Sequence, residues 1–116
     1  MNVKRYHQIF DITNCNDNVN DGQFLRDILQ EIAKTVDMHI IEGPIIAEGG
    51  EGNPGYSALC IIDFSHISIH SFSKYKEALI DIFSCKEWDR EKVKGLILKS
   101  IATENSEIRN KEVWWG

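Results

Sequence analysis

Residues 57–85 decide the fold of this 116-residue chain: SALCIIDFSHISIHSFSKYKEALIDIFSC. Short apolar segments predict paired strands at Tyr56–Phe64 and His66–Phe72 and a further strand at Ala78–Cys85. Four reactive side chains accompany these strands: Ser57, Ser65, His70 and Cys85. Buried polar groups must find partners, so reactive groups set among apolar strands indicate chemistry rather than packing alone.

The preceding half of the chain predicts two strands, a helix and two loops. Tyr6–Thr13 is expected to form a strand, and Asn14–Asp21 a loop rich in turn-forming Asn and Asp. Asp21 caps a helix whose apolar residues recur every three to four positions, namely Phe24, Leu25, Ile28, Leu29, Ile32 and Val36. Met38–Ala47 follows as a strand that its proline weakens, and Glu48–Gly55 is a loop because it holds four of the eight glycines.

After the central strands, Asp89 caps a second helix through Val93, Leu96, Ile97 and Ile101, and Glu107–Trp115 forms a last strand. This order predicts one domain, residues 1–116, with a two-layer α+β sandwich: a mainly antiparallel sheet with helices on one face. The other face of such a sheet is uncovered. We therefore expect a homodimer in which two sheets pack face to face as an αββα sandwich.

The charge balance and the apolar runs argue against nucleic-acid and membrane partners. The chain has 13 Lys and Arg against 18 Asp and Glu, whereas phosphate binding depends on Lys and Arg. Its apolar runs fall short of the ~20 residues that a membrane span needs, and its first residues lack the apolar segment of a signal peptide. Three cysteines at unrelated spacings favour a reduced, cytoplasmic protein.

Two motifs carry a resemblance to a known family. The run Ser65-His66-Ile67-Ser68-Ile69-His70, followed by Asp81-Ile82-Phe83-Ser84-Cys85, resembles the prokaryotic S-adenosylmethionine decarboxylase proenzymes. The likeness extends from about His7 to Asp89. Members of that family cleave themselves before a serine, which becomes a pyruvoyl cofactor. The resemblance therefore implies self-cleavage between Phe64 and Ser65 and a pyruvoyl group generated from Ser65.

The resemblance also implies roles for three other residues. His70 corresponds to a histidine that assists processing, and Ser57 to a serine that assists it from eight residues before the cut. Cys85, fifteen residues after His70, corresponds to the proton donor of turnover. The pyruvoyl ketone forms a Schiff base with the substrate α-amine, and the thiol returns a proton to the α-carbon after carbon dioxide has left. A thiol with an ordinary pKa near 8.5 suits that role at neutral pH.

Strand geometry sets one condition on this mechanism. In a flat strand with a period of two, His66, Ser68 and His70 share one face, and Ser65 has the opposite parity. The junction between Phe64 and Ser65 must therefore turn or bulge if His70 is to act on Ser65.

Three residues depart from the family pattern. Phe64 stands where the family has a glutamate before the cut, and Glu51 where it has a phenylalanine that stacks on adenine. Lys74 replaces a glutamate expected to hold the ribose hydroxyls, and a lysine offers only donors. Phe72 or Tyr56 could supply the aromatic contact instead. We take Glu51, Lys74 and Phe72 as candidate substrate-binding residues.

Three functions follow from these observations. The first is a pyruvoyl-dependent S-adenosylmethionine decarboxylase of spermidine biosynthesis. The second is the same chemistry on arginine or ornithine, whose cationic side chain would suit Glu51 and the acidic loops. The third is an unprocessed, non-enzymatic paralogue that acts as a partner or regulator.

The remaining reactive residues have structural interpretations. Cys60 lies between apolar neighbours and belongs in the core, and Cys15 is expected to be structural. His66 and His70 have no third ligand at a sensible spacing, so we expect no metal site. The pair Trp114-Trp115 is expected to serve packing or a dimer contact.

Overall fold

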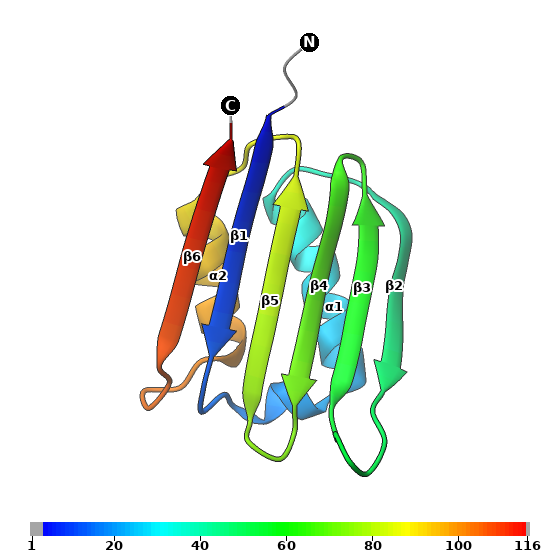
Figure 1. Ribbon diagram of the computed structural model, residues 1–116, viewed down its shortest axis with the longest axis vertical. Helices are drawn as coiled ribbons and strands as arrows, with labels where there is room; N and C mark the ends of the chain where they lie inside the picture. Colours follow the sequence, from blue (N-terminus) through cyan, green and yellow to red (C-terminus); the bar gives the residue numbers. More distant parts are fainter. Residues whose placement is uncertain (1–3, 116) are drawn as a thin grey trace.

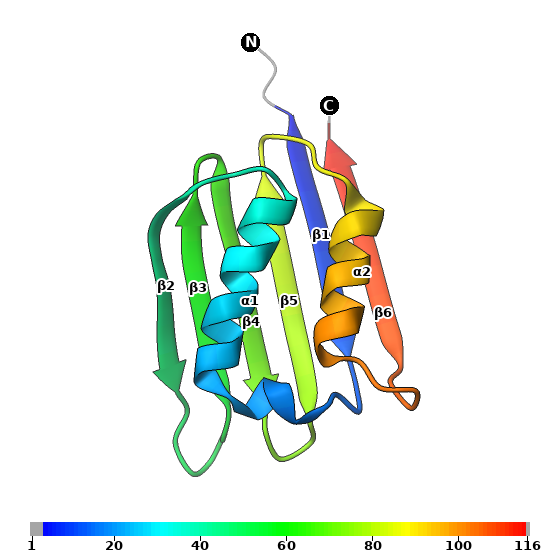
Figure 2. The ribbon, with the colours of Figure 1, turned by 180° about the vertical axis from the view of Figure 1, so that it is seen from behind.

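The computed structural model describes residues 4–115, except the side chain of Trp115. In chain order the elements are β1 (Arg5–Ile12), a short 3-10 helix η1 (Asp17–Asn20), α1 (Gly22–Thr35), β2 (Ile40–Glu48), β3 (Tyr56–Ile62), β4 (Ser65–Phe72), β5 (Glu77–Ser84), α2 (Arg90–Ile101) and β6 (Ile108–Trp115). The strands form one sheet in the order β2-β3-β4-β5-β1-β6, and every neighbouring pair is antiparallel (Figure 1). Both long helices cover the same face (Figure 2), so the predicted α+β sandwich is confirmed.

Each long helix begins at the predicted aspartate. The Asp21 carboxylate accepts hydrogen bonds from the backbone N–H groups of Gln23 and Phe24 at 3.0 and 3.2 Å, and Asp89 accepts one from Lys92 at 3.1 Å. These bonds satisfy N–H groups that have no partner inside the helix. The buried side chains of the helices are Leu25, Ile28, Leu29, Ile32 and Ala33 in α1, and Val93, Ile97 and Ile101 in α2.

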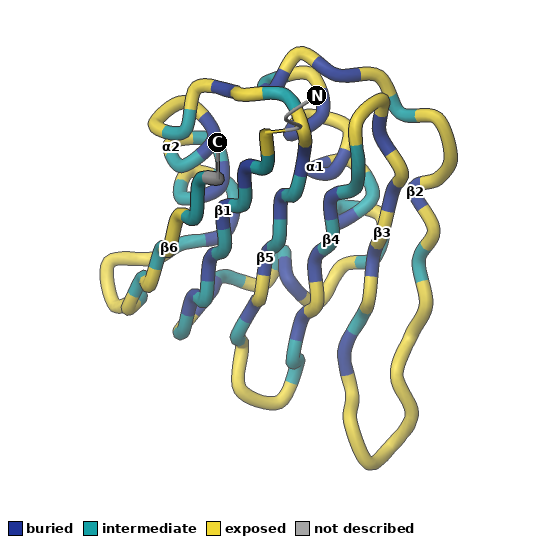
Figure 3. The backbone as a smooth tube through the Cα atoms, turned by 45° about the horizontal axis from the view of Figure 1, so that its top comes forward, coloured by how far each residue is buried: buried dark blue, intermediate teal, exposed yellow. Residues whose placement is uncertain are grey.

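Buried and exposed residues alternate along the central strands (Figure 3). One set of side chains packs under the helices and forms the core, with Phe10, Ile67, Ile69, Ile80 and Ile82 almost fully buried. The other set lies on the face opposite the helices, which we call the uncovered face. On the three central strands this face carries Ser57, Leu59, Ile61, His66, Ser68, His70, Leu79, Asp81 and Phe83.

Two expectations need correction, whereas the predicted strand around Pro44 is confirmed. The loop after β1 contains the short helix η1, because Asn16 caps it by accepting from the Asn18 N–H at 3.0 Å. The strand around Pro44 is β2, which has a cis Gly43–Pro44 peptide and register shifts against β3. The reactive side chains of Ser57, His70 and Cys85 are exposed rather than buried in the core.

None of the helices within residues 4–115 has the length and apolar character needed to cross a membrane.

Candidate active site

Ser57 and His70 form a direct pair on the uncovered face. They are cross-strand partners in β3 and β4, and the Ser57 Oγ lies 2.8 Å from the His70 Nδ1. A cavity of about 60 Å³ adjoins the pair and is lined by Gly49, Asn53, Gly55, Tyr56, Ser57, His70, Ser71 and Phe72. The two residues assigned to processing are therefore brought together, and one ring nitrogen of His70 remains available to another group.

The candidate cleavage site lies in a tight turn. Asp63 and Phe64 form a two-residue turn between Ile62 and Ser65, which pair as the last rung of the β3–β4 ladder. The sequence predicted a turn or bulge at this junction, and the turn immediately precedes Ser65. The Phe64 carbonyl accepts a hydrogen bond from the Cys85 backbone N–H at 3.3 Å. Cys85 is exposed and lies beside Ser65, because Ser65 pairs with Ser84.

A second group beside Ser65 was not foreseen. The His66 Nδ1 lies 3.4 Å from the Ser65 Oγ, and the His66 ring stacks on Phe83 with 5.7 Å between ring centroids. On the far side of Phe83, His7 packs edge-on at 5.3 Å and contacts the Asp81 carboxylate. Only the adjacency of Ser65 and His66 hinted at this in the sequence, because the other contacts cross strands β1 and β5.

The structure does not bring Ser65 and His70 of one chain together. The Ser57–His70 rung and the Ile62–Ser65 rung are five positions apart along the β3–β4 hairpin. At ~3.4 Å per residue this separates them by ~17 Å. We call the end with residues 63–65 and Cys85 the turn end. The opposite end, with residues 49–57 and 70–76, we call the loop end.

The candidate substrate-binding residues gather at the loop end. Glu51, Phe72 and Lys74 line one cavity of about 160 Å³ together with Gly52, Asn53, Pro54 and Tyr75. The Lys74 ammonium lies 5.5 Å from the centre of the Tyr75 ring. The cavity thus combines a carboxylate, an ammonium and two aromatic rings, and it adjoins the Ser57–His70 pair through Asn53 and Phe72.

The other two cysteines lie in the core. Cys15 and Cys60 are buried, and burial raises the pKa of each thiol to about 11. Both therefore stay protonated at neutral pH, as expected of packing residues. In the part of the chain that the structure describes, no three His, Cys, Asp or Glu side chains are grouped as a metal ion would require.

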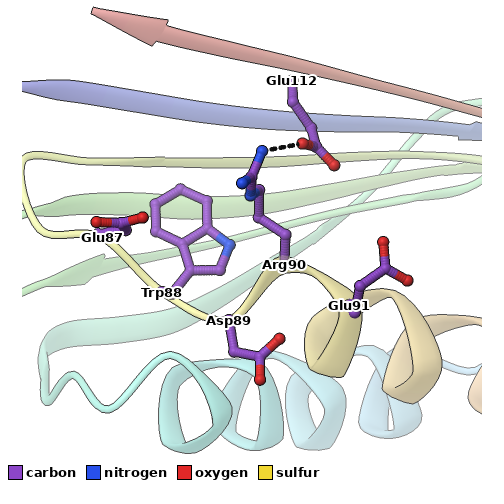
Figure 4. A pocket seen from close by; sticks show the side chains of 6 residues that line it. All are labelled: Glu87, Trp88, Asp89, Arg90, Glu91 and Glu112. Atoms are coloured by element: carbon purple, nitrogen blue, oxygen red, sulfur yellow. Dashed lines mark hydrogen bonds and ion pairs between the residues drawn. The ribbon is translucent and has the colours of Figure 1, made fainter. Parts of the chain in front are cut away.

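A separate cavity of about 330 Å³ lies where α2 begins (Figure 4). Its lining residues are Glu87, Trp88, Asp89, Arg90, Glu91 and Glu112, and Arg90 forms an ion pair with Glu112. Arg90 also lies over the Trp114 ring, 4.5 Å from its centre. Trp114 packs against Tyr6 and Trp88, which confirms a packing role, whereas the side chain of Trp115 is outside the described residues. None of the candidate site residues lines this cavity.

The fold and the comparisons with known proteins together define the class of small α+β decarboxylase proenzymes. The family model described as S-adenosylmethionine decarboxylase matches residues 6–112. The chain therefore belongs to the S-adenosylmethionine decarboxylase family.

Individual relatives are distant. An arginine decarboxylase proenzyme from Caldivirga maquilingensis is 28% identical over 85 residues, which cover 72% of this chain and 63% of that protein. S-adenosylmethionine decarboxylase proenzymes from two Clostridium botulinum strains, Loch Maree and 657, are each 27% identical over 94% of this chain and 93% of theirs. The crystal structure of the adenosylmethionine decarboxylase from Aquifex aeolicus VF5 has the same fold. It superposes with a TM-score of 0.75 at 16% identity, covering 96% of this chain and 91% of that one.

Proposed function

We propose that the chain is a proenzyme that cleaves itself between Phe64 and Ser65 and becomes a pyruvoyl-dependent decarboxylase. Each active site is shared between two protomers. The observation that carries this proposal is the division of the reactive groups between the two ends of the β3–β4 hairpin. Ser65 and Cys85 are at the turn end, and the hydrogen-bonded Ser57–His70 pair is at the loop end.

Self-cleavage needs only Ser65, a base and water. The Ser65 Oγ attacks the Phe64 carbonyl carbon, and the C–N bond breaks to give an ester and a free Ser65 amine. A base removes the Ser65 α-proton while the Phe64 carboxylate leaves from the β-carbon, so residue 65 becomes dehydroalanine. Its imine tautomer is hydrolysed by one water molecule to the ketone and ammonia. His70, held by Ser57, is the proposed base, because imidazole titrates near neutral pH.

The residues at the turn end fit the formation of a pyruvoyl group. The Cys85 N–H donates to the Phe64 carbonyl, the group that Ser65 must attack, and so polarises it. Once formed, the pyruvoyl ketone would supply the electron sink that decarboxylation requires. The exposed Cys85 thiol is the proposed donor of a proton to the substrate α-carbon. The unpaired cysteines support a reducing, cytoplasmic environment.

A two-fold dimer would complete each site. The pairs Ser57–His70 and Ser65–Cys85 are ~17 Å apart in one protomer by strand spacing, too far for direct proton transfer. If two uncovered faces pack together about a two-fold axis that runs across the strands, the loop end of one protomer faces the turn end of the other. Large exposed apolar side chains on this face support such packing, namely Ile45, Leu59, Ile61 and Leu79.

S-adenosylmethionine is the first candidate substrate, which would make the enzyme a step in spermidine biosynthesis. Membership of the family supports it, as do the relatives from Clostridium botulinum that cover nearly the whole chain. The cavity of about 160 Å³ at the loop end is smaller than the ~300 Å³ of a typical ligand pocket, so walls from the partner protomer would have to complete it.

Arginine or ornithine is the second candidate, favoured by the residues that line that cavity. Glu51 offers a carboxylate for a cationic side chain, whereas Lys74 cannot accept a hydrogen bond from a ribose hydroxyl. The relative from Caldivirga maquilingensis carries the name arginine decarboxylase proenzyme. Measuring carbon dioxide release from S-adenosylmethionine, arginine and ornithine in competition distinguishes the two candidates.

The self-cleavage is tested by a denaturing gel and intact mass. Wild-type protein should give two chains, residues 1–64 and 65–116, and the second should be lighter than its sequence because Ser65 has become a ketone. Ser65→Ala should stay full length, whereas the control Ser68→Ala, on the same strand, should be cleaved. If the wild-type chain stays full length and has no group reactive toward hydroxylamine, the proposal is wrong. The protein is then an unprocessed paralogue without enzyme activity.

Sharing of the site is tested by mixing two inactive chains. A Ser65→Ala chain keeps His70, and a His70→Ala chain keeps Ser65. Neither should be cleaved when expressed alone. In mixed dimers the site that combines the two intact residues should cleave the His70→Ala chain, in about half of those chains if pairing is random. If co-expression restores no cleavage, the shared site is wrong.

A further inference from the structure

The conformation of the Asp63–Phe64 turn, which carries the candidate cleavage site, depends on contacts with other parts of the chain. Two-residue hairpin turns normally place a residue with positive φ, such as glycine or asparagine, in the turn. Among residues 4–115, positive φ outside glycine occurs only at Asn14, Asp37 and Lys76, so neither Asp63 nor Phe64 has it. Two-residue turns without a positive φ match the twist of the flanking strands less well. Other parts of the chain must therefore help to fix this turn.

Asp63 receives most of those contacts. Its carboxylate accepts a hydrogen bond from the His39 backbone N–H at 2.6 Å and lies 3.0 Å from the His39 Nδ1. Its own backbone N–H donates to the His39 carbonyl at 3.0 Å. His39 belongs to the segment between α1 and β2, so three contacts join the turn to a segment far away in the sequence. The pKa of Asp63 is lowered, first by the His39 N–H and, further down, by the His39 side chain and Lys86.

The next residue is held from a different side. The Phe64 carbonyl accepts from the Cys85 N–H at 3.3 Å, and Cys85 follows β5. The two residues before the cleaved bond are thus each held by another part of the chain: Asp63 by the α1–β2 segment and Phe64 by the residue after β5. The Phe64 side chain makes no such anchor, because it is about half exposed.

We propose that Asp63 is a positioning residue for self-cleavage and that His39 is its partner. This inference rests on the proposed function. Attack of the Ser65 Oγ on the Phe64 carbonyl requires the oxygen and the carbon to approach within ~3–3.5 Å along a defined direction. By fixing Asp63, the α1–β2 segment sets the orientation of the Phe64 carbonyl while Cys85 holds its oxygen. Asp63 touches neither of the reacting atoms, and it acts through the turn.

The test measures the rate of chain cleavage in pulse-labelled protein made by cell-free translation. Asp63→Ala removes every side-chain contact and should slow cleavage at least tenfold. Asp63→Asn keeps an oxygen that can accept from the His39 N–H and should restore most of the rate. His39→Ala keeps the backbone contacts of His39, so it should slow cleavage by only a few fold.

Asp89→Ala is the matched control. Asp89 also accepts a backbone hydrogen bond, from Lys92 at the start of α2, but it does not contact the turn. It should lower the melting temperature without slowing cleavage. The inference is overturned if Asp63→Ala and Asp63→Asn are both cleaved at the wild-type rate, or if Asp89→Ala slows cleavage as much as Asp63→Ala. A wild-type chain that never cleaves overturns the proposed function itself, and this role of Asp63 with it.

Discussion

The turn end and the loop end of the β3–β4 hairpin are built in different ways. The turn end has two turn residues, which backbone hydrogen bonds join to the α1–β2 segment and to Cys85. The loop end has a glycine-rich loop and the β4–β5 turn, tied to each other by the bond from the Ser73 N–H to the Pro54 carbonyl at 3.1 Å. Glu51 and Lys74, the candidate substrate-binding residues that were expected to differ from the family pattern, both lie at the loop end.

This difference suggests a division of labour. In the proposed mechanism the turn end holds Ser65, which changes covalently, and Cys85, the proton donor of turnover, while the loop end contributes the processing base His70. The geometry of the turn end must then be fixed to fractions of an ångström. The loop end would choose the substrate, and a change of residues there can alter recognition while leaving the chemistry intact. Loops commonly carry such variation because they lie on the surface of a rigid scaffold.

Of the variants that test this comparison, Cys85→Ala should cause the largest loss of activity, and it alters the turn end alone. The backbone N–H of residue 85 remains, so the variant should still be cleaved into two chains. Without the thiol, kcat should fall by about 100-fold or more, the usual contribution of a general acid, with KM unchanged. A side reaction that protonates the wrong carbon should also inactivate the enzyme during turnover. Unchanged turnover would remove Cys85 from the mechanism.

Gly55→Ala should show that the loop end has a defined backbone. Gly55 has a φ of +148°, and an added Cβ would lie 2.0 Å from the Ser71 carbonyl oxygen. We expect a loss of about 2 kcal/mol in the free energy of unfolding. Gly52→Ala, in the same loop, is the control: its Cβ would meet nothing within 4 Å, and its effect should stay within ~0.5 kcal/mol. Urea denaturation of uncleaved Ser65→Ala protein measures both. Equal effects would mean that the loop has no fixed conformation.

Lys74→Glu should change recognition rather than chemistry. A carboxylate at this position could accept both ribose hydroxyls, which lysine cannot. If S-adenosylmethionine is the substrate, its KM should fall by about tenfold, the value of one good hydrogen-bonded contact, with kcat unchanged. A fall in kcat without a change in KM would contradict the division between the two ends.

A smaller effect is expected from acid, which should remove the stabilisation that the Asp63 carboxylate gives to the turn end before the chain unfolds. The pKa of Asp63 is lowered in the folded state, so between the folded and unfolded values the folded chain binds fewer protons. Its stabilisation is therefore complete above about pH 4, the ordinary aspartate value, and is lost as the pH falls through the folded value. The stability difference between Ser65→Ala protein and the same protein with Asp63→Asn should shrink from pH 7 to pH 3. A constant difference would show that the Asp63 charge contributes nothing.

The fold was largely predictable because its signals are local. Asp21 and Asp89 precede amphipathic segments, and each caps the helix expected of it. Short apolar segments located β3, β4 and β5 to within two residues. The contact of Ser57 with His70 was also implicit, because the two residues are equally distant from the turn. The same register separates His70 from Ser65, which a comparison of strand faces alone did not reveal.

The contacts that hold the site depend on loops and on strand order, and these have no local signal. The bond from His39 to Asp63 depends on the path of the chain between α1 and β2. His7 meets Asp81 because β1 is inserted beside β5, although the two residues are far apart in the sequence. The roles given to Ser57, Ser65, His70 and Cys85 stay predictions, since they depend on chemistry that a static arrangement does not perform.

The strand order also determines what a cut at Phe64 would produce. Residues 1–64 contain β1, β2 and β3, and residues 65–116 contain β4, β5 and β6. Because β1 lies between β5 and β6, the two products are interleaved through three ladders rather than lying side by side. They should remain one particle in native solution and part only when the whole sheet unfolds. Unfolding of one cleaved protomer then releases two separate chains. The melting temperature of the cut protein should therefore rise with its concentration, even for a protein that is not a dimer.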